Sequence, residues 1–218
     1  MKLLSVNIGQ PREIRFGDRV VQTAIVKSPI DAVDAEVTPL GIDGDTQVDQ
    51  ENHGGIHQAV YAYFEDSYRY WQTELNRDDL TPGTFGENLT ISGMTEETVC
   101  IGDVFDIGDV RLQVSQPRQP CFKLGLVMGD QRFVERFLAS QRLGTYFRVL
   151  RPGRIPFQAE ISKTATGPGE ISLSDVCRLR YFDKHDLAGA ARCASLPDLS
   201  PEWRATFEAR IRGTEFDA

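Results

Sequence analysis

Short alternating apolar segments, separated by turn residues, dominate the first 40 residues of the chain. Strands are predicted at residues 3–8, 20–27 and 34–40, with Gly, Pro and Asp between them. Alternation of apolar and polar side chains is typical of strands with one buried face. Because no helical pattern intervenes, we expect these strands to pair in an antiparallel sheet that closes on itself.

Short apolar segments separated by turn residues continue to about residue 155. Only two stretches in this region have apolar residues at helical spacing. Helices are predicted at residues 66–75 and 130–138. The further predicted strands lie at residues 59–64, 99–107, 110–115 and 144–150. Residues 164–169 then read as a short linker rich in Gly and Thr.

Beyond this linker the apolar residues recur with helical spacing. Helices are predicted at residues 174–182, 187–194 and 201–212, the last with Ser200 at its N-cap and Pro201 at its first position. Three short helices bury little core alone, so we expect them to pack on the sheet or on a partner. The sequence therefore predicts a mainly β domain at residues 1–165 and a small three-helix domain at residues 166–218.

The composition disfavours several classes of partner. The net charge is −8 over 218 residues, whereas a nucleic-acid surface is normally basic, so no nucleic acid polymer is expected. No apolar run is long enough for a signal segment or a membrane span, so no membrane association is expected. Cys100, Cys121, Cys177 and Cys193 form no Cys-x-x-Cys pair, which favours free thiols in a reducing cytoplasm.

Cys121 stands in a stiff loop between two fixed positive charges. Pro117 and Pro120 restrict the backbone of this loop, and Arg118 and Lys123 flank the thiol. Nearby cations favour a thiolate, which is both a nucleophile and a metal ligand. The alternative is that Cys121 packs as a small apolar residue. The sequence of the loop does not decide between these two roles.

Three other segments carry polar residues of interest. Gly54 and Gly55 separate His53 from His57 and break the helix that a two-histidine metal pair requires, so a structural histidine is favoured. Glu87-Asn88 suits hydrogen bonding to a polar heterocycle, or a hairpin turn. Arg148 lies within an apolar strand, where it would need a carboxylate partner or an anion pocket. No phosphate-binding glycine motif is present.

Taken together, these segments resemble the MOSC domain family, in its YiiM-like branch of 6-N-hydroxylaminopurine resistance proteins. The resemblance covers most of residues 20–155 in matching order and spacing. The C-terminal helices, with residues 199–203, resemble the three-helix domain that follows MOSC in that branch. It rests on Gly41-Ile42-Asp43-Gly44-Asp45, His53-Gly54-Gly55, Ala59-Val60-Tyr61-Ala62-Tyr63, Phe85-Gly86-Glu87-Asn88-Leu89, Gln116-Pro117-Arg118-Gln119-Pro120-Cys121-Phe122-Lys123-Leu124 and Tyr146-Phe147-Arg148-Val149.

The resemblance implies a MOSC-type β-barrel with a few peripheral helices, followed by a small three-helix domain. It also implies a molybdenum cofactor (Mo-molybdopterin), with Cys121 as the metal ligand and Arg118 beside it as a second catalytic residue. The residues implied to bind the cofactor are Lys27, His53, Gly54, Gly55, Glu87, Asn88, Arg118, Lys123 and Arg148. Pyridoxal phosphate binding is implied only for MOSC domains at large.

The implied activity is the reduction of small N-hydroxylated bases and related compounds, with detoxification as the outcome. No flavin, haem or iron–sulfur motif is apparent, so a separate electron-donating reductase is implied. The sequence does not decide whether the protein forms a homodimer. One departure from the branch is Gln58, where a lysine is usual. The alternatives are a non-catalytic cofactor carrier or sulfur-handling protein, and a barrel with a redox-sensing thiol.

Overall fold

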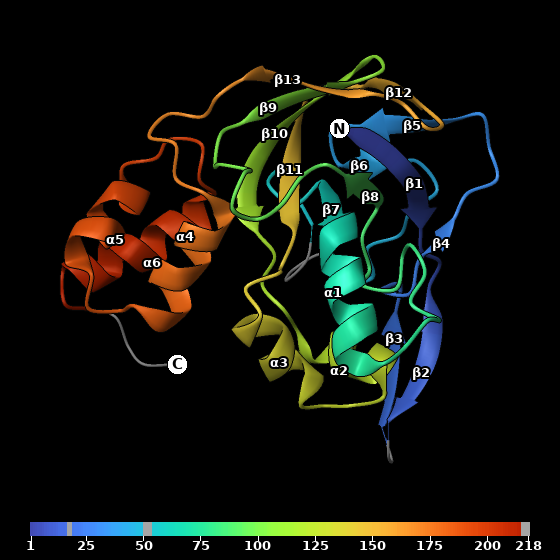
Figure 1. Ribbon diagram of the computed structural model, residues 1–218, viewed down its shortest axis with the longest axis horizontal. Coiled ribbons are helices and arrows are strands. Elements are labelled where there is room, and N and C mark those ends of the chain that lie inside the picture. Colours follow the sequence, from blue (N-terminus) through green and yellow to red (C-terminus); the bar gives the residue numbers. More distant parts are fainter. Residues whose placement is uncertain (17–18, 50–53, 215–218) are drawn as a thin grey trace.

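The computed structural model describes residues 1–16, 19–49 and 54–214 of the chain (Figure 1). Its largest element is a curved sheet of eight strands. In sheet order these are β13 (Ile161–Ala165), β9 (Val104–Ile107), β10 (Val110–Pro117), β11 (Thr145–Arg151), β7 (Val60–Phe64), β8 (Leu89–Ser92), β1 (Lys2–Ile8) and β4 (Ser28–Pro29). Two small sheets comprise β12 (Gly153–Pro156), β5 (Asp34–Thr38) and β6 (Gly41–Ile42), and β2 (Arg12–Phe16) and β3 (Arg19–Thr23). The mainly β fold is confirmed.

The closed barrel predicted from the sequence is not found among the described residues. The sheet has two ends, β13 and β4. β1 meets the start of β13 through the single bridge Lys2–Glu160 and two backbone hydrogen bonds, from Ile161 to Met1 of 3.0 Å and from Leu3 to Ala159 of 2.9 Å. The chain turns at Gln158, where φ is +57°, directly before these residues. The contact between the two strands is therefore too short to form a continuous ladder.

One pair of neighbouring strands in the large sheet is parallel. β7 and β8 run in the same direction, with Ala62 opposite Leu89. The helix α1 (Glu65–Leu75) lies between them in the chain, and such a crossover is what a parallel pair needs. The strand and the helix predicted at residues 59–64 and 66–75 are confirmed to within one residue.

The strand predicted at residues 20–27 is shorter in the structure. β3 ends at Thr23, and the next strand, β4, comprises only Ser28-Pro29. Pro29 pairs with Asn7 of β1 at the edge of the sheet. An edge position tolerates proline because no neighbouring strand needs its missing amide.

A cluster of aromatic side chains lies below the sheet, where α1 meets α2 (Phe122–Met128) and α3 (Phe133–Ala139). The ring centroid of Trp71 lies 4.8 Å from that of Phe133, and Phe85 lies 4.6 Å from Tyr63. Ring pairs at this separation add to the stability gained from burial. The cluster holds the helix that follows Cys121 against the sheet.

The C-terminal residues form the predicted helices. They are α4 (Leu173–Cys177), continued by a π-helical turn η1 (Arg178–Phe182), then α5 (Leu187–Ala194) and α6 (Pro201–Ile211). We expected Ser174 to cap the first helix, but Ser172 does so, accepting from the Asp175 amide at 3.0 Å. The helix begins there because Ile171 still bonds to the backbone of Ile101.

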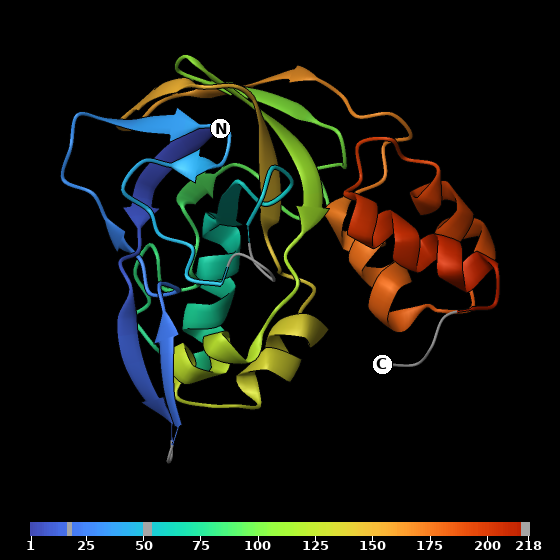
Figure 2. The same ribbon diagram turned by 180° about the vertical axis from the view of Figure 1, so that it is seen from behind.

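These helices lie beside the end of the large sheet that contains β9 and β10, as Figure 2 shows from behind, and they share a core with it. Leu112 and Phe147 of the sheet belong to the same buried cluster as Trp203 and Phe207 of α6. The expected packing of the helices on the sheet is confirmed, and Cys177 and Cys193 are buried as expected. No helix within the described ranges is long and apolar enough to cross a membrane.

Candidate functional site

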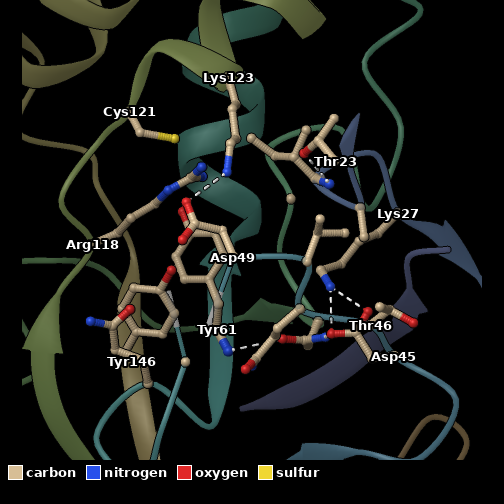
Figure 3. A pocket seen from close by; sticks show the side chains of 18 residues that line it. Thr23, Lys27, Asp45, Thr46, Asp49, Tyr61, Arg118, Cys121, Lys123 and Tyr146 are labelled. Carbon is tan, nitrogen blue, oxygen red and sulfur yellow. Dashed lines mark hydrogen bonds and ion pairs between the residues drawn. The ribbon is translucent and has the colours of Figure 1, made fainter. Parts of the chain in front are cut away.

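A cavity opens where the residues after β3, the loop of residues 45–49 and the start of α2 face β7 and β11 (Figure 3). It encloses about 640 Å³, part of it open to solvent. The pairing of β11 with both β10 and β7 brings these distant segments together. We call this space the inner cavity.

Cys121 lies between the end of β10 and the first residue of α2. The end of β10 is paired with β11 as far as Pro117, so the loop starts from a hydrogen-bonded strand. The thiol is half-buried. In Figure 3 its sulfur points into the inner cavity, toward the same space as the Arg118 guanidinium and the Lys123 amine.

Arg118 is a buried cation, with 5% of its surface exposed. It donates a hydrogen bond to the carbonyl of Phe85, and its guanidinium carbon lies 4.8 Å from the ring centroid of Tyr61. A carbonyl oxygen and an aromatic face both stabilise a positive charge away from water. The charge on Arg118 also interacts with Cys121, and such a neighbour favours a thiolate.

Two lysines of the inner cavity are each paired with a carboxylate. Lys27 Nζ lies 2.5 Å from Asp45 Oδ2, and Lys123 Nζ lies 3.2 Å from Asp49 Oδ2. Burial lowers the pKa of Lys27, and Asp45 opposes this effect. With Arg118, the described walls carry three cations and two carboxylates. A thiolate at Cys121 would balance the remaining positive charge, which is that of Arg118.

Asn88 lines the inner cavity, but its side chain is engaged by the protein. Its Nδ2 donates to Asp45 Oδ2 at 2.8 Å, and its Oδ1 accepts from the Tyr61 amide at 3.1 Å. The predicted role in hydrogen bonding a heterocycle would require these bonds to break. The local turn that we considered as the alternative is not its role either, since its partners are distant in sequence.

Glu87 is not part of the inner cavity wall. Its Oε1 accepts hydrogen bonds from the Tyr68 hydroxyl at 2.5 Å, the Gly83 amide at 2.8 Å and the Thr90 hydroxyl at 2.8 Å. Burial raises the pKa of Glu87, and these donors oppose the rise. In this structure the carboxylate holds the loop before β8 in place.

Arg148 also lies away from the inner cavity. It donates to Gln113 Oε1 at 2.8 Å, to the Asp198 carbonyl at 2.8 Å and to His57 Nδ1 at 3.0 Å. A guanidinium has no acceptor, so His57 must accept through Nδ1 and is neutral. Burial, followed by the charges of Arg148 and Arg204, lowers the pKa of His57. Arg148 therefore ties the sheet to the segment before α6.

A larger cavity adjoins the inner one, and we call it the outer cavity. It lies between the turn of residues 54–58, the Cys121 loop and the first residues of α6, and encloses about 1730 Å³, part of it open to solvent. Gln58, Cys121 and Tyr146 line both cavities. A group bound in one cavity would therefore meet a group in the other beside Cys121.

The glycine turn forms part of both rims. Gly54 lines both cavities, and a Cβ there would lie 2.2 Å from Gln47 Oε1 at a φ of +117°. Gly55 lines only the outer cavity of the two. His53, which we expected to bind the cofactor, lies outside the described residues. No group of three His, Cys, Asp or Glu side chains suited to a metal occurs in the part of the chain that the structure describes.

Sequence reasoning missed several polar residues of the inner cavity. Asp45, Tyr61 and Tyr146 appeared only within the segments that carry the resemblance, and Asp49, the partner of Lys123, was not singled out. The rings of the two tyrosines lie 5.1 Å apart. Burial raises the pKa of Tyr146, although Arg118 opposes the rise, so its hydroxyl stays protonated at neutral pH. A tyrosine in a strand gives no signal of which cavity it faces.

Two family models match the chain. One, described as MOSC domain, matches residues 49–162. The other, described as YiiM-like, 3-alpha helix domain, matches residues 171–214. The chain belongs to the MOSC domain family.

Full-length relatives share this MOSC arrangement. The chain is 38% identical over 205 residues to "Uncharacterized protein YflK" of Bacillus subtilis (strain 168), covering 94% of this chain and 92% of that protein. The crystal structure of YiiM from Geobacillus stearothermophilus superposes with a TM-score of 0.81 at 33% identity, covering 95% and 97% of the two chains. The MOSC fold and the helical domain after it are therefore shared with YiiM.

A third relative is a longer MOSC-containing protein. The chain is 34% identical over 198 residues to a protein named "Reductase" from Gibberella moniliformis (strain M3125 / FGSC 7600). The match covers 89% of this chain and 35% of the fungal protein. Most of the fungal protein therefore lies outside the region that the two share.

Proposed function

We propose that this MOSC protein is an oxidoreductase that holds a molybdenum cofactor through Cys121 and reduces N-hydroxylated bases such as 6-N-hydroxylaminopurine. The observation that carries the proposal is the position of the Cys121 thiol at the junction of the two cavities, beside the buried charge of Arg118. The fungal relative named as a reductase supports an oxidoreductase role.

The inner cavity suits such a cofactor. A thiolate is a soft ligand, appropriate for a redox-active metal. The Lys123 amine points into the same space as the Cys121 sulfur, and we propose that it meets the phosphate of a pterin cofactor. When bound, the cofactor would supply the two-electron chemistry of the reaction.

The chain's own residues would bind the cofactor and keep the reacting region ordered. Arg118 cannot move freely, because Phe85 and Tyr61 hold it, so its charge stays beside the thiolate. Reduction of an N-hydroxylated amine consumes two electrons and two protons and yields the amine and water. Tyr146 lines both cavities, and we propose that its protonated hydroxyl donates a hydrogen bond to the departing oxygen.

The two electrons must come from another protein or domain. We propose a separate reductase partner, and the additional length of the fungal relative is consistent with a fused one. The biological outcome that we propose is detoxification of N-hydroxylated compounds.

The proposal is tested by measuring molybdenum per chain after expression in a host that makes the cofactor. Wild type and Cys100→Ser should contain equal molybdenum, because Cys100 lies outside both cavities, and Cys121→Ser should contain little. Equal molybdenum in Cys121→Ser would remove this thiol as the ligand. Loaded wild type should reduce 6-N-hydroxylaminopurine with an electron donor, and full metal content without turnover would favour a carrier instead.

A further inference from the structure

The outer cavity has one wall from the C-terminal helical domain. Ser200, Pro201 and Glu202, at the start of α6, face the same space as Cys121. The hydrogen bond from the Ser200 amide to the Ser115 carbonyl, 3.0 Å long, fixes this wall to β10. β10 leads within six residues to Cys121. The start of α6 is therefore held at a defined position relative to the thiol.

Ser200 is buried and its hydroxyl is unused. The residue is 2% exposed, and among the described residues its Oγ has no hydrogen-bond partner. Serine at this position normally caps the helix by accepting from a first-turn amide, but Ser200 makes no such bond. A buried hydroxyl without a partner is unfavourable, so its retention next to a cavity points to a ligand.

The groups around Ser200 indicate which kind of ligand atom would bind beside its hydroxyl. In the first turn of α6, an eleven-residue helix that begins with Pro201, the amides of Glu202 and Trp203 have no partner within the helix. The Ser200 hydroxyl adds another donor, so this wall suits an acceptor atom. Glu202 also lines the cavity, and its carboxylate disfavours an anion. A neutral carbonyl oxygen meets both conditions.

We propose that Ser200 and the first turn of α6 bind a ring carbonyl of the N-hydroxylated substrate, so that the C-terminal domain completes the substrate site. This inference rests on the proposed reductase function. It assigns the inner cavity to the cofactor and the outer cavity to the substrate, which meet at Cys121. Substrates with a ring carbonyl, such as N-hydroxycytosine, would bind through Ser200, whereas 6-N-hydroxylaminopurine has no ring carbonyl and would not use this contact.

The test is calorimetric binding of the two compounds to cofactor-loaded protein. Ser200→Ala should weaken binding of N-hydroxycytosine about five-fold, the effect of one lost hydrogen bond, and leave binding of 6-N-hydroxylaminopurine nearly unchanged. Ser200→Thr keeps the hydroxyl and should bind like wild type. Ser195→Ala is the matched control, since that hydroxyl bonds only to the Arg192 carbonyl on the exposed side of α5.

Thermal unfolding of the same variants excludes a structural role for the hydroxyl. Ser200→Ala should melt at or above the wild-type temperature, because no capping bond is lost. A lower melting temperature with unchanged affinities would show a helix cap and overturn the proposal, as would failure of the wild type to bind N-hydroxycytosine. If wild type binds both compounds selectively but reduces neither with an electron donor, the subsite stands and the reductase function fails.

Discussion

Lys27 and Asp45 form an ion pair within the inner cavity, and each side chain is less than one-tenth exposed. Lys27→Met would leave the Asp45 carboxylate buried without its cation. We expect the free energy of unfolding, measured in urea, to fall by about 3–5 kcal/mol. The double variant with Asp45→Asn should recover part of this loss, because the uncompensated charge is gone.

The matched control is Lys2→Met. Lys2 pairs with Glu160, but the two side chains are 65% and 70% exposed. Its removal should change the free energy of unfolding by less than about 0.5 kcal/mol. Equal effects of the two lysine variants would contradict the burial of the Lys27 pair.

Glu96 should make the protein less stable as the pH rises toward neutrality. Its carboxyl is buried, bonded to the Gly144 amide at 3.0 Å, and burial raises its pKa from 4.5 to about 7. The unfolded chain releases this proton near pH 4.5, whereas the folded chain keeps it until about pH 7. The contribution of Glu96 to stability should therefore be largest below pH 4.5 and fall by about 3 kcal/mol by pH 7.

Glu96→Gln should remove this part of the pH dependence, because the amide does not titrate and can still bond to Gly144. Denaturant unfolding across pH 4 to 8 measures the effect, and Glu97→Gln, at the exposed neighbouring position, should retain the wild-type profile. Parallel pH profiles for wild type and Glu96→Gln would show that Glu96 is not responsible.

Arg118 should control the reactivity of Cys121. Arg118→Met removes the cation that interacts with this thiol, so alkylation of Cys121 by iodoacetamide at pH 7 should slow on the order of tenfold. Arg118→Lys keeps the positive charge and should retain most of the rate. Mass spectrometry of the Cys121 peptide over time gives the rates. If both variants slow equally, packing rather than charge controls the thiol.

Arg148 and Lys123 should differ in their effects on cofactor content. Lys123→Met removes a cation of the inner cavity and should lower the molybdenum per chain. Arg148→Met should leave molybdenum unchanged but lower the melting temperature, because it breaks the links from the sheet to His57 and Asp198. Loss of molybdenum in Arg148→Met at an unchanged melting temperature would support the role expected from the sequence.

Features set by neighbouring residues were predictable from the sequence. The helix α5 has the predicted bounds because its start and end signals lie next to it in the chain. The Cys121 loop was singled out because Arg118 and Lys123 are within three residues of the thiol. In both cases the physical cause and its sequence signal are local.

Roles that depend on distant partners were not predictable. Asn88 bonds to Asp45, 43 residues away, and Arg148 bonds to the Asp198 carbonyl, 50 residues away. Each residue has the chemistry for ligand binding, but a protein partner that only the folded chain brings near occupies it. The alternation that identifies a strand also cannot show that Tyr61 and Tyr146 face one cavity.

Leu112 and Phe147 of the sheet share one core with Trp203 and Phe207 of α6. This shared core couples the unfolding of the two parts of the chain. The predicted boundary between residues 165 and 166 separates two sequence families, but it passes through a single apolar interior. A truncated chain ending there would expose one side of β10 to water and should aggregate. We therefore expect the two parts to behave as one cooperative unit, melting together in a single transition.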